Sequence, residues 1–133
     1  MSGKLSTHVL DTAKGRPVAG LKIQLWKIEA DERRLLKEVI TNQDGRTETP
    51  LLLGEELKPG VYELVFQVGP YLQDLSRRSV PKADLSRSVA KAEATEDTFL
   101  GDVPVRFHIL NPGENYHIPL LVSPWGYTTY RGS

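Results

Sequence analysis

The sequence predicts an all-β fold, an antiparallel β-sandwich of seven to eight short strands. Hydrophobic side chains alternate with polar ones over residues 20–28 and 102–110, which is typical of strands with one buried face. Glycine and proline recur in short polar segments that separate such runs, and these residue types favour turns. The turn segments are 14–17, 42–45, 58–60 and 111–113. Short strands at this spacing are typical of sandwiches and barrels.

Each strand is predicted from its residue types. In the first alternating run, Leu21, Ile23 and Leu25 occupy one face and polar side chains the other. In the second run, Pro104 lacks a backbone N–H, which restricts that strand to a sheet edge or a strand start. The remaining segments are rich in β-branched and aromatic residues. They are 5–10, 35–41, 61–67, 116–122 and 127–130, with 47–50 as a possible eighth strand.

Two segments depart from this strand pattern. Residues 71–94 lack alternation and are rich in Ala, Lys, Arg, Glu and Leu, so they are predicted to form one or two short helices interrupted at Pro81. We interpret them as part of a helical, charged insertion at about 70–98 within a single domain spanning 1–133. The charge cluster at 29–34 is predicted to be the solvated tip of a hairpin, without a function.

Composition excludes several classes of protein. The 133 residues include 17 Lys+Arg and 17 Asp+Glu, so there is no net charge to attract nucleic acid or an anionic membrane. The absence of cysteine excludes disulfides, a thiolate nucleophile and Cys-ligated zinc. No apolar run approaches the roughly 20 residues that a membrane span needs, and the first residues do not resemble a signal peptide. We therefore expect a cytoplasmic protein.

The three histidines all lie within predicted strands. Alternation places His8 on the same face as Ser6, and it directs His117 away from the most apolar face of its strand. His108 lies beside Arg106 on the polar face of its strand, and we interpret it as structural. Spacing alone leaves a surface or core role open for each histidine, although a rigid strand would position an imidazole well for chemistry.

Spacing alone allows two catalytic arrangements to be compared with the sequence. A zinc-hydroxide hydrolase needs three protein ligands, but the sequence contains no HExxH motif and no close pair of histidines, so no metal is predicted. A triad of Ser123, His117 and a carboxylate would lack the Gly-x-Ser-x-Gly turn that exposes a nucleophilic serine in many hydrolases. Neither arrangement is favoured.

Two long segments resemble a known family. The LSTHVLD sequence of residues 5–11 with GRPVAG at 15–20, and the YHIPLLVSPWGYTTYRGS sequence of 116–133, resemble the two signature segments of the transthyretin-like 5-hydroxyisourate hydrolases. The resemblance extends over the strands between 5 and 69 and over 102–133. The terminal YRGS sequence favours the enzymes over transthyretin itself, the thyroid-hormone carrier, which lacks this ending.

The resemblance implies a transthyretin-like sandwich and a cofactor-free reaction. The implied substrate is 5-hydroxyisourate, the product of urate oxidation, and the implied product is 2-oxo-4-hydroxy-4-carboxy-5-ureidoimidazoline. Attack of water on a ring carbonyl requires a base, a donor to hold the developing oxyanion, and contacts that orient the ring. The alternative is a transthyretin-like carrier of small molecules without catalysis.

The same resemblance implies a set of site residues. His8, Arg46, His117 and Ser133 are the expected catalytic residues, and His8, Arg46 and Tyr130 are the expected substrate contacts. Either imidazole could activate water, because histidine exchanges protons near neutral pH. The guanidinium would hold a carbonyl oxygen or an anionic substrate. The resemblance further implies a homotetramer whose sites form between subunits.

Overall fold

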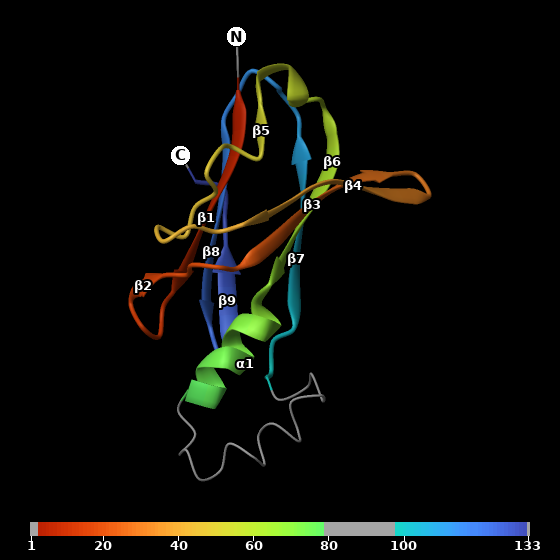
Figure 1. Ribbon diagram of the computed structural model, residues 1–133. Coiled ribbons are helices and arrows are strands. Elements are labelled where there is room, and N and C mark those ends of the chain that lie inside the picture. The colour runs from red at the N-terminus through yellow and green to blue at the C-terminus, as the bar shows by residue number, and fades with distance from the viewer. Residues whose placement is uncertain (1–2, 79–97, 133) are drawn as a thin grey trace.

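A computed structural model describes residues 3–78 and 98–132 of the chain as two β-sheets packed face to face (Figure 1). The first sheet contains, in spatial order, β2 (Arg16–Pro17), β1 (Lys4–Asp11), β8 (Tyr116–Ser123) and β9 (Gly126–Thr129), with β5 (Leu52–Leu53) paired to β1. The second contains β4 (Glu32–Ile40), β3 (Lys22–Glu29), β6 (Gly60–Gln67) and β7 (Asp102–Ile109). The predicted sandwich is confirmed, and Pro104 lies on the edge strand β7, as predicted.

Strands β1 and β8 run parallel, whereas the other described strand pairs are antiparallel. The parallel pair joins the two ends of the chain in one sheet, with Ser6 opposite His117 and His8 opposite Pro119. Parallel neighbours need a long connection, and here nearly the whole chain connects them. The sandwich is therefore not wholly antiparallel, and the exception is the pair of strands that carries two of the three histidines.

The hydrophobic core lies between the two sheets. In β1, the buried Leu5, Thr7 and Val9 alternate with the half-buried Ser6 and His8, which project from the outer face of the sheet. Full burial of an aliphatic or aromatic side chain contributes roughly 1.5–3 kcal/mol, so this alternation fixes which face of β1 points outward. The largest fully buried core side chains include Leu5, Leu21, Ile23, Leu25, Tyr62, Leu64, Phe66 and Leu120.

The charge cluster at 29–34 forms the exposed tip of the β3–β4 hairpin, as predicted, with β3 ending at residue 29 and β4 beginning at residue 32. Strand β4 therefore starts three residues before the predicted residue 35. Charged side chains suit an edge strand such as β4, where they deter pairing with another chain. The possible strand at 47–50 does not form, and the two-residue β5 follows it instead. The predicted turn at 14–17 ends in the short strand β2.

Helix α1 (Val68–Arg78) follows β6 without a break and starts earlier than the predicted 71–94. The Tyr71 hydroxyl donates a hydrogen bond of 2.6 Å to Oδ2 of the buried Asp11, which ties the helix to the end of β1. Asp11 Oδ1 accepts the backbone N–H groups of Ala13 and Lys14, both at 2.9 Å. Residues 79–94 of the predicted helical segment lie outside the described residues. Among those that are described, no helix has the length and apolar character to cross a membrane.

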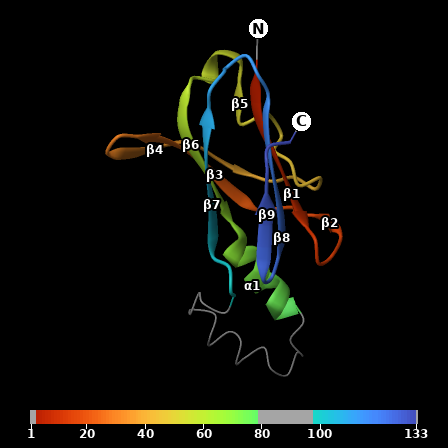
Figure 2. The same ribbon diagram turned by 180° about the vertical axis from the view of Figure 1, so that it is seen from behind.

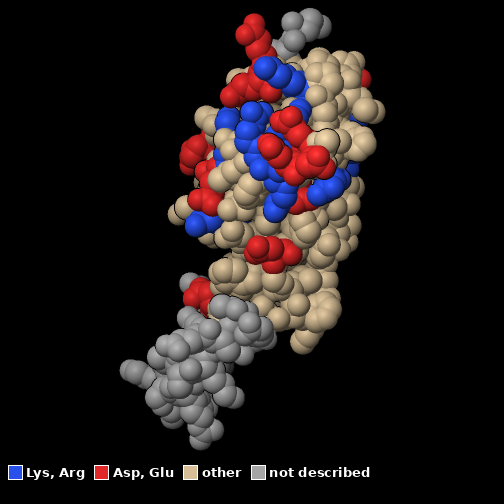
Figure 3. All heavy atoms as spheres, turned by 90° about the vertical axis from the view of Figure 1, so that its right-hand side faces the viewer, with Lys and Arg blue, Asp and Glu red and all other residues tan. Residues whose placement is uncertain are grey.

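The outer face of the second sheet carries a network of charges. The buried carboxylate of Glu63 lies 3.2 Å from Arg33 Nη2 and 3.1 Å from Arg106 Nε. The Arg33 guanidinium also lies over the ring of Trp26, 4.3 Å from its centroid. Figure 3 shows basic and acidic side chains intermixed on the side that carries β6 and the β3–β4 hairpin. Neither sign of charge dominates this side, so it offers no surface suited to a polyanion.

Candidate active site

Two predicted site histidines lie side by side on the outer face of the first sheet. His8 projects from β1 and His117 from β8, and both rings are half-buried. In the parallel register, Ser6 is the direct neighbour of His117, and its Oγ lies 2.9 Å from the imidazole Nδ1. Alternation along each strand correctly predicted this face. The two histidines are 109 positions apart in sequence, and the sheet brings them together.

The loop that carries Arg46 is held against β1 by backbone hydrogen bonds. Asn42 Oδ1 accepts the backbone N–H groups of Asp44 at 2.9 Å and Arg46 at 3.2 Å, which closes the turn. The carbonyl of Gly45 accepts the N–H of Val9 at 2.8 Å, immediately after His8 in β1. Gly45 has φ of 74°, and a Cβ there would collide with the Val9 carbonyl oxygen. A glycine is therefore required for this loop to dock beside the histidine.

The positive charge of Arg46 acts on both imidazoles. Partial burial lowers the pKa of His8, and the Arg46 guanidinium lowers that pKa further, against the raising effect of a hydrogen bond to the backbone of Asp44. Burial is also the largest cause of the lowered pKa of His117, followed by the charges of Arg46, His8 and Lys4. The two rings are consequently neutral at pH 7, the form in which an imidazole accepts a proton. The site thus combines two potential bases with one permanent cation.

The C-terminal segment returns to His117. Gly132 donates its backbone N–H to the His117 carbonyl at 2.6 Å, and the two residues form a β-bridge. A Cβ on Gly132 would lie 2.7 Å from the ring carbon Cδ2 of His117, so the glycine backbone lies directly against the imidazole. The predicted catalytic residue Ser133 follows Gly132 and lies outside the described residues.

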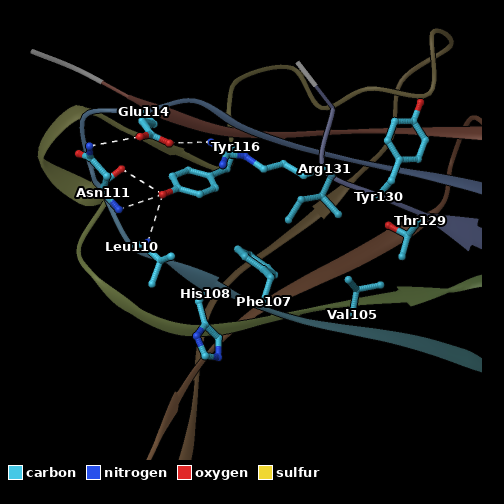
Figure 4. Close-up of a pocket in the computed structure, with 11 residues that line it drawn as sticks. Val105, Phe107, His108, Leu110, Asn111, Glu114, Tyr116, Thr129, Tyr130 and Arg131 are labelled. Carbon is cyan, nitrogen blue, oxygen red and sulfur yellow. Dashed lines mark hydrogen bonds and ion pairs between the residues drawn. The ribbon is translucent and has the colours of Figure 1, made fainter.

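Tyr130, a predicted substrate contact, lies elsewhere in the protomer. It lines a largely apolar cavity of about 350 Å³ between β7, β8 and β9 (Figure 4). His8, His117 and Arg46 are not among the described residues that line this cavity. Figure 4 shows the Tyr130 hydroxyl pointing away from the other labelled residues. Within one chain, the structure therefore brings together three predicted site residues but not the tyrosine.

Arg131 closes one side of the same cavity. Its Nη2 lies 3.0 Å from Glu114 Oε1 and donates to the Asn115 carbonyl at 2.9 Å, while its guanidinium lies over the Tyr116 ring at 4.3 Å. These contacts fix the strand end from which Tyr130 projects (Figure 4). We interpret Arg131 as a structural residue that holds the C-terminal segment in place.

The remaining alternatives find no support in the described part of the chain. His108 is exposed on β7, in the other sheet, where it lines the cavity of Figure 4 and not the surface that carries His8 and His117. The hydroxyl of Ser123 donates to the Gly126 carbonyl at 3.3 Å, at the end of β8. No group of three or more His, Asp or Glu side chains among the described residues is placed to hold a metal ion.

Sequence reasoning did not assign three residues that build the site. Ser6 lies two positions before His8, and alternation already placed both on one face, but nothing in the sequence near residue 6 reveals its pairing with His117. Gly45 is needed because a Cβ there would collide with the Val9 carbonyl oxygen, and Gly132 because its backbone closely approaches the His117 imidazole. Close approach of two distant segments has no local sequence signal other than the presence of glycine.

Comparison with known proteins gives concordant matches. The family model described as the HIUase/Transthyretin family matches residues 5–132. The "5-hydroxyisourate hydrolase" of Halalkalibacterium halodurans is 48% identical over the whole of both chains, and the "5-hydroxyisourate hydrolase 2" of Rhizobium meliloti is 46% identical over 99% of this chain and 98% of its own. Among solved structures, an (S)-allantoin synthase aligns with a TM-score of 0.80 and 39% identity, over 99% of this chain and 44% of that one.

Proposed function

Since the chain belongs to the HIUase/Transthyretin family, we propose that it hydrolyses 5-hydroxyisourate, the activity for which its relatives are named. The product would be 2-oxo-4-hydroxy-4-carboxy-5-ureidoimidazoline, which places the reaction in urate degradation. Relatives that align over essentially the full length are named as hydrolases, so the alternative of a carrier without catalysis is not favoured.

One observation supports the proposal most directly. Two imidazoles with lowered pKa values lie on one outward-facing sheet surface, beside a loop that presents a guanidinium. A small cavity of about 120 Å³, lined by Ser6, Arg46 and residues 47–50 among others, opens beside Ser6, the residue bonded to His117. Neutral imidazoles next to a fixed cation suit a reaction in which a proton leaves water while negative charge develops on a carbonyl oxygen.

The proposed reaction follows from these groups. One of the two imidazoles takes a proton from water as the water oxygen bonds to a ring carbonyl carbon of the substrate. The Arg46 guanidinium donates hydrogen bonds to the carbonyl oxygen, which becomes an oxyanion. The amide C–N bond then breaks, the proton passes from the imidazolium to the departing nitrogen, and the carbonyl carbon becomes a carboxylic acid, which releases its own proton to solvent to give the carboxylate of the product. The reaction consumes one water molecule and requires no redox step and no further reactant.

The other predicted residues complete the proposed site. We propose that Tyr130 contacts the substrate and that Ser133 holds the water or an imidazole, in a site shared between the subunits of a homotetramer. A shared site would account for the separation of Tyr130 from the histidines within one chain, because a neighbouring chain would supply the missing contact.

Features of the protomer support assembly with further copies. β7 and β9 are edge strands of the two sheets, and the largely apolar cavity of Figure 4 opens between them. The view in Figure 2 shows both edges on the same side of the molecule. Unpaired edges next to apolar surface favour pairing with another chain. Sedimentation velocity should give four times the mass of one chain, and a monomer at assay concentration would contradict the tetramer.

The activity is tested by following the ultraviolet decay of 5-hydroxyisourate that urate oxidase generates in the cuvette. We expect catalytic amounts of the protein to accelerate the decay and a chelator to leave the rate unchanged. Decay no faster than the spontaneous rate would contradict the proposed function.

Histidine variants connect the activity to the site. His117→Ala is expected to lower kcat by about 10²-fold or more, within the range for loss of a general acid or base. His108→Ala is the matched control, because His108 is also a strand histidine but lies exposed on the other sheet. Equal activity of the two variants would remove His117 from the mechanism.

A further inference from the structure

We infer that Ser6 is the positioning residue for His117, whose hydroxyl holds Nδ1 of the imidazole so that the ring presents Nε2 to the substrate. The inference deepens the proposed function and rests on it for its kinetic part. It assigns a role to a side chain that lies outside the expected set of His8, Arg46, His117, Ser133 and Tyr130.

The geometry around the imidazole supports this role from two sides. Ser6 Oγ lies 2.9 Å from Nδ1, a normal hydrogen-bond distance, between residues that are direct neighbours in the β1–β8 register. On the ring edge that bears Cδ2, the backbone of Gly132 lies so close that a Cβ there would be 2.7 Å from the ring. One edge of the ring is thus bonded and another is packed, which restricts rotation about the side-chain torsions.

The Ser6 hydroxyl suits a group that must change its protonation state. A serine hydroxyl both donates and accepts, so it can bond to a neutral imidazole in either tautomer and also to the imidazolium. The hydrogen bond made by one ring nitrogen determines which proton the other nitrogen carries. With Nδ1 occupied by Ser6 throughout, proton exchange with water or substrate takes place at Nε2.

The location of Ser6 agrees with a role inside the site. Ser6 lies on the same strand face as His8, two residues away, and it lines the small cavity next to Arg46. His8 is oriented by a different partner, the backbone of Asp44. Each imidazole therefore has its own hydrogen-bond partner, and only His117 depends on a side chain that mutation can remove.

The closing experiment compares three variants at Ser6. Ser6→Ala removes the hydroxyl, and Ser6→Thr retains it. Ser6→Val matches Thr in shape without the hydroxyl, and β-branched residues are favoured in strands, so the Thr/Val pair isolates the hydroxyl even if Ala perturbs β1. Ser123→Ala is the control, because Ser123 bonds to a backbone carbonyl at the far end of β8. Kinetics and the ring-nitrogen chemical shifts of His117, from ¹⁵N NMR, are measured for each.

We expect Ser6→Ala and Ser6→Val to lower kcat about tenfold with little change in KM, consistent with one lost hydrogen bond, while Ser6→Thr and Ser123→Ala stay near the wild type. The nitrogen shifts of His117 should change in Ala and Val and not in Thr. Unchanged shifts, or unchanged kcat, in Ser6→Val would overturn the inference. A fall to the spontaneous rate with unchanged shifts would also overturn it and would indicate a serine nucleophile instead.

Failure of the inference and failure of the proposed function are distinguishable. The nitrogen spectra report on the contact between Ser6 and His117 in the resting protein, without any substrate. If the wild-type protein leaves the decay of 5-hydroxyisourate unaccelerated, the proposed function fails whatever the spectra show. If the wild type is active but its His117 shifts do not respond to Ser6→Val, only the positioning role fails.

Discussion

Gly132 donates its backbone N–H to the carbonyl of His117 at 2.6 Å, and its Cα lies against the imidazole of the same residue. A side chain at position 132 would therefore push the ring from its place, since a Cβ would lie 2.7 Å from Cδ2. Residue 132 thus holds the proposed catalytic imidazole through backbone contact, which requires a residue without a Cβ.

Gly132→Ala should therefore lower turnover without unfolding the protein. Because a displacement of about 1 Å at a reacting group can cost 10²-fold, we expect kcat/KM to fall between about tenfold and a hundredfold. Gly126→Ala is the control, since a Cβ there meets no described atom within 4 Å. Steady-state kinetics and thermal melting of both variants check the prediction. Wild-type kinetics in Gly132→Ala would show that the ring tolerates displacement.

Loss of the Arg46 charge should raise the pKa of both site histidines. Burial lowers each pKa first and Arg46 contributes next, so Arg46→Gln removes the second cause and leaves the first. NMR titration of the imidazole C–H signals measures the change without any activity. Arg34→Gln, which removes an exposed cation on β4, should leave both curves in place. Coincident curves for Arg46→Gln and wild type would mean that the guanidinium lies too far from the rings to act on them.

The lowered pKa values of His8 and His117 determine how turnover depends on pH. A histidine whose folded-state pKa lies below the ordinary value of about 6.5 stays neutral further into acid, so turnover should persist below that pH and fall only at the lowered pKa. The contribution of the two histidines to folding stability should be complete above pH 6.5 and decrease below it, because the unfolded chain then binds protons more readily than the folded chain. A pH–rate profile with its acid limb at or above 6.5 would contradict these directions.

The sequence was sufficient for the seven longer strands, though not for the two-residue strands β2 and β5, and for the outward face of both site histidines, because a buried hydrophobic row forces its neighbours to the other face. The sequence was not sufficient for features that depend on pairing between strands far apart in the chain. The parallel pairing of β1 with β8, which places Ser6 beside His117, joins segments more than a hundred residues apart and has no local pattern. Likewise, alternation said nothing about which cavity Tyr130 would line.

Local errors in the prediction also have physical causes. The strand now labelled β4 was predicted to start at residue 35 because charge usually marks solvent-exposed turns, but it begins at residue 32, since an exposed edge strand tolerates charge on both faces. Helix α1 begins at Val68, directly after the end of β6, and therefore before the predicted residue 71. Pro70 does not prevent this early start, because proline is tolerated in the first turn of a helix, where its missing N–H has no hydrogen-bond partner to lose.

Replacement of Arg46 by lysine separates charge from shape. Arg46→Lys keeps a positive charge near the histidines, so their pKa values should stay low, but an ammonium cannot form the planar two-pronged contact to an oxyanion. We expect kcat/KM to fall about 10²-fold, as for loss of an oxyanion donor. The ultraviolet decay assay and the NMR titration are run on the same sample. Near-wild-type kinetics of Arg46→Lys would mean that Arg46 contributes only its charge and not its planar shape.

The contact between Tyr71 and Asp11 should stabilise the fold without serving the chemistry. Asp11 is 2% exposed and its carboxylate accepts three hydrogen bonds, of which the Tyr71 hydroxyl supplies the one from helix α1. Tyr71→Phe leaves one oxygen of a buried carboxylate without that donor, which should lower the free energy of unfolding by about 1–3 kcal/mol. Urea denaturation measures it, with Tyr127→Phe at an exposed tyrosine as control. Because the imidazoles keep their own partners, kcat should be retained, and a parallel loss of kcat would instead mean that α1 helps to hold β1 in its catalytic register.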